Sequence, residues 1–146
     1  MRYAYSFQPD TRQNNQSPTA VLTAIAIPVF TAQLEKSRDS TDQANIRSAY
    51  AELVAALITN DKAADVGTEL AKSKTFTWTA PTNATGNAGD YVATISGKGT
   101  NTDWDNLPSG QTFKIGTVTV TPVANFKTAT FTVDANGQVS AIVLAA

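Results

Sequence analysis

The chain has 146 residues, a formal net charge of −1 and a charged fraction of 16%, and it contains neither cysteine nor histidine. This length predicts one domain, and the near-neutral charge gives no reason to expect sequence-specific binding of nucleic acid. The missing residue types exclude disulfides, thiolate and histidine-ligated metal sites, cysteine nucleophiles and serine–histidine triads. We therefore expect no enzyme, no catalytic residue and no cofactor.

Residues 1–19 are mostly polar and include the stretch QNNQ. They contain no apolar core of the kind found in a secretory signal, so we expect a disordered or non-native segment. Ser17 and Pro18 are typical of a helix start, with the serine near the cap and the proline in the first turn. The helix that follows is expected to end near residue 59.

Residues 20–30 form an apolar run interrupted only by Thr23. A helix that is apolar on every side is buried, either in the core of its own domain or by other subunits or a membrane. We favour the second alternative because the run lies at the edge of the chain and lacks a polar face. The run is shorter than the roughly 20 residues that span a bilayer. The residues expected to make subunit contacts are Val21, Leu22, Ile25, Ile27, Pro28, Val29 and Phe30.

Pro28 lies inside this run. Proline lacks a backbone N–H and its ring clashes with the preceding turn, so it predicts a kink or local melting of the helix near Ala24. A helix over residues 19–59 would be roughly 60 Å long at 1.5 Å per residue. That length is unusual for a small globular domain and natural for a filament subunit.

After Pro28 the helical pattern becomes amphipathic, with a dense apolar stripe from Ile46 onward that we expect a sheet to cover. Between Leu34 and Ile46 the stripe is thin, and this part is predicted to project from the globular head. The remaining surface is expected to carry the charged side chains Glu35, Lys36, Arg38, Asp39, Asp42, Arg47 and Glu52.

Beyond Asn60 the sequence becomes rich in Thr, Val, Gly and Asn. Residues 62–73 predict a weak second helix or a turn, broken by Gly67. Alternating segments predict strands, and Asn136-Gly137 is typical of a hairpin turn. The strands are expected at residues 75–79, 91–96, 111–123 with a break or bend at Gly116 and Pro122, 128–133 and 138–144.

The predicted fold class is therefore α+β. A long N-terminal helix, kinked near Pro28, packs by its C-terminal half on an antiparallel sheet of four or five strands. We divide the chain into the polar segment 1–19, the long helix 20–60 and a β-rich head 61–146.

One loop offers a candidate metal site. Asp103 and Asp105 flank Trp104 and are oxygen ligands of the type that calcium prefers. The loop lacks the spacing of a calcium loop, so a solvated Asp/Asn turn is the favoured alternative. Trp104 could be half exposed and face a partner, although packing inside the head is the preferred interpretation, and Trp78 is expected to fill the core between sheet and helix.

The segment AIAIPVF at residues 24–30, followed by TAQLEKSRDSTDQANIRSAYAEL, strongly resembles the type IV pilin family, including pseudopilins and the pilin-like proteins of Gram-positive bacteria. The resemblance covers residues 20–57 closely and the remainder only in layout. It implies a homo-oligomeric helical filament assembled through the N-terminal helix. It also implies an extracellular, cell-surface protein that is anchored in the cytoplasmic membrane before assembly in the intact family form.

The first residues depart from the family pattern. Counting back from Pro28, the family's first mature residue would fall at about Phe7 and its glutamate at about Thr11. We expect the usual leader and the first half of the apolar helix to be replaced or missing, so processing and the glutamate contact are not carried over.

The expected function is a structural subunit of a type IV pilus or pseudopilus that supports adhesion, motility or DNA uptake. The alternative is a soluble extracellular binding module, an adhesin or competence component, that acts through its loops.

Overall fold

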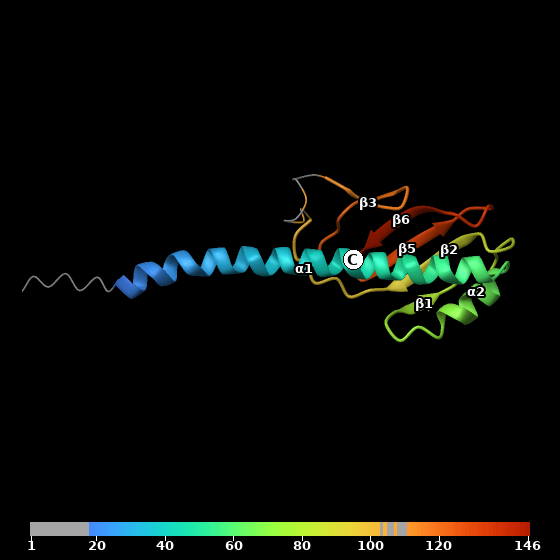
Figure 1. Cartoon of the computed structure of the whole chain (residues 1–146), viewed down its shortest axis with the longest axis horizontal. Coiled ribbons are helices and arrows are strands. Elements are labelled where there is room, and N and C mark those ends of the chain that lie inside the picture. Colours follow the sequence, from blue (N-terminus) through green and yellow to red (C-terminus); the bar gives the residue numbers. More distant parts are fainter. Residues whose placement is uncertain (1–17, 103, 105–106, 108–110) are drawn as a thin grey trace, which may run out of the picture.

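The computed structural model describes residues 18–102, 104, 107 and 111–146, with side chains from residue 28 onward. A long helix, α1 (Pro18–Thr59), and a short helix, α2 (Ala63–Leu70), precede six strands. Figure 1 shows α1 as a rod whose C-terminal half lies along the head and whose N-terminal half extends beyond it. The expected α+β class and the position of the long helix are confirmed.

Four strands form one antiparallel sheet in the order β1-β2-β5-β6, and two more form a separate hairpin, β3-β4. The sheet thus has four strands, and the predicted strand over residues 111–123 forms the second sheet. The strand bounds are β1 Thr77–Thr79, β2 Gly89–Thr94, β3 Phe113–Ile115, β4 Val118–Val120, β5 Thr128–Val133 and β6 Val139–Ala145.

Turn residues separate the strands where the sequence predicts. Gly116 has a φ of 59° and turns β3 into β4, which confirms the predicted break at this glycine. Gly137 has a φ of 74° in the β5–β6 hairpin, whose turn also accepts hydrogen bonds at Asp134 Oδ1 from the N–H groups of Asn136 (2.8 Å) and Gln138 (2.9 Å). Glycine adopts such left-handed conformations without a Cβ penalty.

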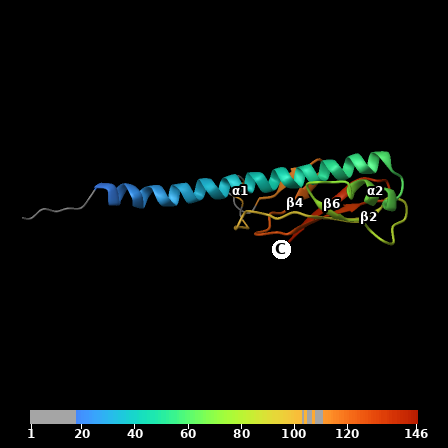
Figure 2. The same ribbon diagram turned by 90° about the horizontal axis from the view of Figure 1, so that it is seen from below.

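The core lies between the C-terminal half of α1 and one face of the sheet, as Figure 2 shows from the side. Ile46 and Leu53 are fully buried, together with Phe131 at the centre of β5. Trp78 packs on Phe131 with ring centroids 5.6 Å apart and donates from Nε1 to Glu52 Oε2 on α1 at 3.2 Å. The predicted position of the apolar stripe is confirmed, and Trp78 packs between sheet and helix as expected but is only partly buried.

Two predicted interruptions of helices are wrong. α2 runs through Gly67, where the chain approaches closely enough that an added Cβ would lie 2.8 Å from the Cβ of Ala80. α1 runs without a break through Pro28, so local melting does not occur, while the kink near Pro28 stays a prediction. Proline removes a single N–H donor, and a long helix accommodates its ring by bending slightly.

Candidate functional site

The most conspicuous surface feature is one uncharged face of α1, which we call the outer face. Its residues follow one another at alternating steps of four and three, the spacing of a helix-packing seam. All are exposed. The outer face consists of Phe30, Leu34, Ser37, Thr41, Ala44, Ser48, Ala51, Ala55 and Ile58.

Large apolar side chains stand at both ends of the outer face. Phe30 is 71% exposed, Leu34 42% and Ile58 79%. Between them the side chains are small, so another helix could approach the backbone of α1 closely. The pair Phe30 and Leu34, one helical turn apart, is the informative part of this face, because soluble monomers rarely keep clustered large apolar side chains in contact with water.

The structure describes three of the seven predicted contact residues in full. Pro28, Val29 and Phe30 are exposed, so the alternative that this segment is a core helix of its own domain is wrong for these residues. The other four, Val21, Leu22, Ile25 and Ile27, lie on α1, but their side chains are outside the described part of the chain.

A second feature of α1 was not predicted. Glu35, Asp39 and Asp42 are buried, with exposures of 7%, 0% and 0%. The prediction that this part of α1 projects with solvated charges is therefore wrong. The covering element is residues 97–102, which we call the strap, and it reaches α1 from a position after β2.

The strap is bound to α1 through carboxylates. Asp42 accepts hydrogen bonds from the backbone N–H of Lys98, at 2.9 Å to Oδ1 and 2.7 Å to Oδ2, and from that of Gly99 at 2.7 Å. Glu35 Oε1 accepts from the backbone N–H of Thr100 and from its hydroxyl at 2.8 Å. Charged acceptors make such hydrogen bonds stronger than neutral ones.

These hydrogen bonds also decide the ionisation of Glu35. The backbone N–H of Thr100 lowers the pKa of the Glu35 carboxyl below its ordinary value, against the opposing effect of desolvation. The Thr100 hydroxyl and Arg38, whose Nη1 lies 3.2 Å from Oε2, lower the pKa further. Donors to the ionised form stabilise that form, so Glu35 is held as a carboxylate.

Trp104 follows the strap and is buried, with 1% exposure. Its ring stacks on Phe113 at 5.3 Å and lies 6.3 Å from Phe126. The preferred interpretation that it packs inside the head is confirmed, and it offers no exposed aromatic surface to a partner. The candidate calcium ligands Asp103 and Asp105 lie outside the described residues. Within the described part, no group of three or more acidic residues is placed to hold a metal ion.

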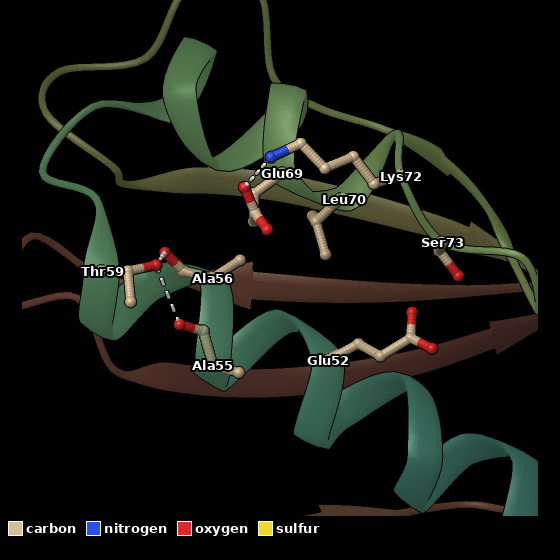
Figure 3. Close-up of a pocket in the computed structure, with 8 residues that line it drawn as sticks. All are labelled: Glu52, Ala55, Ala56, Thr59, Glu69, Leu70, Lys72 and Ser73. Atoms are coloured by element: carbon tan, nitrogen blue, oxygen red, sulfur yellow. Dashed lines mark hydrogen bonds and ion pairs between the residues drawn. The ribbon is translucent and has the colours of Figure 1, made fainter.

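Figure 3 shows a pocket of about 400 Å³ between α1 and α2. Its two carboxylates already have partners in the fold, because Glu69 Oε2 pairs with Lys72 Nζ at 2.6 Å and Glu52 accepts from Trp78. The pocket therefore offers no pair of free carboxylates for acid–base chemistry.

Comparison with known proteins gives no match to any protein family, curated protein or solved structure. Among the described residues, no helix combines the length and the hydrophobicity that crossing a membrane requires.

The buried acids could have been found from their spacing. Positions 35, 39 and 42 continue, at steps of four and three, into Ile46, Ala49 and Leu53 of the core stripe. Carboxylates in register with a core stripe indicate a covering element that supplies N–H donors, because buried charges require hydrogen-bonding partners.

Proposed function

We propose that the protein is a structural subunit of a filament of the type IV pilus or pseudopilus kind, assembled through α1. The observation that supports this most directly is the outer face, an uncharged and exposed seam with large apolar residues at both ends. The resemblance of residues 20–57 to type IV pilins supports the same assignment. On this proposal the subunit is extracellular at the cell surface, and the resemblance adds an anchor in the cytoplasmic membrane before assembly in the intact family form.

Assembly would bury the outer face of one copy against α1 of another. Full burial of a side chain such as Phe30 or Leu34 contributes about 1.5–3 kcal/mol. Small residues such as Ala44 and Ala51 let two helices approach closely, and the four–three spacing favours helices that cross at a shallow angle. The head, attached to the opposite side of α1, would then face outward and make the contacts between neighbouring heads.

The test is self-association of the full chain carrying Phe30→Lys and Leu34→Lys together. We expect the double variant to remain monomeric at concentrations at which the unchanged chain forms larger species, because each added charge would have to be desolvated in the seam. Sedimentation velocity and negative-stain electron microscopy measure this directly.

Val143→Lys is the matched control, since Val143 is a large apolar residue on the head that is 58% exposed and lies off the outer face. It should leave association unchanged. Equal association of the double variant and the unchanged chain would overturn the assignment of this face, and a monomeric unchanged chain at every concentration would overturn assembly through α1.

A further inference from the structure

The strap is attached on two sides by different chemistry. On the side of the head, neutral backbone hydrogen bonds hold it, from Gly97 N–H to the Phe126 carbonyl and from Asn125 N–H to the Gly99 carbonyl, both 2.8 Å. On the side of α1, the described bonds end on the carboxylates of Asp42 and Glu35. Acid therefore affects the two attachments differently, because carboxylates as a class can be protonated in acid solution and backbone carbonyls cannot.

The fit on the α1 side is tight at Gly99. A Cβ added at Gly99 would lie 2.5 Å from Asp39 Oδ1 and 3.3 Å from Asp42 Oδ2. Three neighbouring N–H groups, on residues 98–100, therefore depend on two carboxylates for acceptors. A protonated carboxyl presents an O–H donor and a weaker acceptor, so protonation weakens these bonds.

Glu35, Asp39 and Asp42 lie on one buried face of α1. Among the charged side chains near them, Arg38 pairs with Glu35 and remains 42% exposed, Lys98 directs only its backbone N–H to Asp42 and is itself exposed, and Arg47 lies over the ring of Phe113 at 5.6 Å. Hydrogen bonds from backbone N–H groups therefore stabilise much of the negative charge on the carboxylates of Glu35 and Asp42.

We propose that the strap is an acid-released latch. Acid detaches residues 97–102 from their carboxylate acceptors on α1 while the four-stranded sheet stays folded. Release separates α1 upstream of Ile46 from the head, so that the head is held by the contacts that α1 makes from Ile46 onward. It also uncovers Trp104, whose indole Nε1 lies near the same point as the Asp39 and Asp42 carboxylates at Gly99. This inference is independent of filament assembly, since it concerns contacts within one chain.

Hydrogen exchange followed by NMR tests the latch, with rates corrected for the intrinsic effect of pH. We expect the N–H groups of Lys98, Gly99 and Thr100 to lose at least tenfold of their protection between pH 7 and about pH 3, while those at the centre of β5, such as Phe131, remain protected. Tryptophan fluorescence of a Trp78→Phe variant, in which Trp104 is the remaining tryptophan, should shift to the red over the same pH range.

Asp42→Asn should reproduce the open strap at pH 7, because the amide lacks the negative charge and its NH2 group would face the Lys98 N–H, donor against donor, in place of an accepting oxygen. Asp90→Asn is the matched control, since Asp90 is an exposed carboxylate that accepts from the Thr132 hydroxyl at 2.7 Å. If Asp42→Asn fails to fold, Glu35→Gln tests the same point at the Thr100 N–H alone. Strap protection that follows β5 at every pH, or that survives these substitutions at pH 7, would overturn the latch.

Discussion

Gly99 is the residue that allows the strap to reach the buried carboxylates. Its N–H donates to Asp42, and an added methyl group would meet Asp39 Oδ1 at 2.5 Å, inside van der Waals contact. Neither carboxylate can move away easily, since both are fully buried. At this position glycine is required by close approach to another residue.

Gly99→Ala should therefore lower the free energy of unfolding by about 1–3 kcal/mol, the usual effect of forcing extra volume into a packed site. Urea denaturation at pH 7 measures the change. Lys98→Ala is the control, because it keeps the backbone N–H that binds Asp42 and removes only an exposed side chain. It should change stability by less than about 0.5 kcal/mol, and an equal loss in both variants would contradict the steric explanation.

The helix α1 has two opposed faces, of which one is buried and the other is exposed. The inner face is buried by the sheet from Ile46 onward and by the strap before it, while the outer face is exposed throughout. The stripe from Ile46 could be predicted because its residues are apolar and local in sequence. The register of Glu35 and Asp42 with this stripe indicates their burial, but their partners could not be predicted, since these lie 65 and 56 positions away in a loop without a periodic pattern.

Substitution of Pro28 would show how far the stability of the exposed half of α1 depends on the helix propensity of its own residues. This part of the helix has no sheet beneath it, and proline is about 3 kcal/mol less favourable than alanine in a helix interior. Pro28→Ala should therefore raise the protection of backbone N–H groups in residues 22–32 several-fold in hydrogen exchange, with little change in the unfolding of the head.

Gln33→Ala provides the comparison for this prediction. It is an exposed position on the same helix, and glutamine is already a good helix former. It should change protection only slightly. If both substitutions have the same small effect, contacts outside this chain segment, rather than Pro28, limit the stability of the exposed half.

For the whole molecule, the fold joins an apolar core to a separate acidic contact. Chain order, the hairpin at Asn136-Gly137 and the core stripe could all be predicted from periodicity and turn residues. The strap could not, because its position is decided by hydrogen bonds from Lys98, Gly99 and Thr100 to another element. The stability of the molecule should consequently depend on pH through the Glu35 carboxylate as well as on apolar burial.

Glu35 gives this pH dependence a definite sign. Its pKa in the folded protein lies below the ordinary value of 4.5, so the folded state binds its proton less readily than the unfolded state. Its contribution to stability is therefore complete above about pH 4.5 and is lost as the pH falls through the lower folded pKa. Glu35→Gln should be less stable than the unchanged chain at pH 7, and the difference between the two should be smaller at pH 3.

Urea denaturation at both pH values measures this convergence. Glu69→Gln is the matched control, because Glu69 also pairs with a cation three positions away, Lys72 at 2.6 Å, but on an exposed surface. Exposed pairs contribute little, so this variant should stay close to the unchanged chain throughout. A stability difference for Glu35→Gln that is as large at pH 3 as at pH 7 would mean that Glu35 acts through the shape of its side chain, since a contribution from its charge must disappear once the carboxylate is protonated in both states.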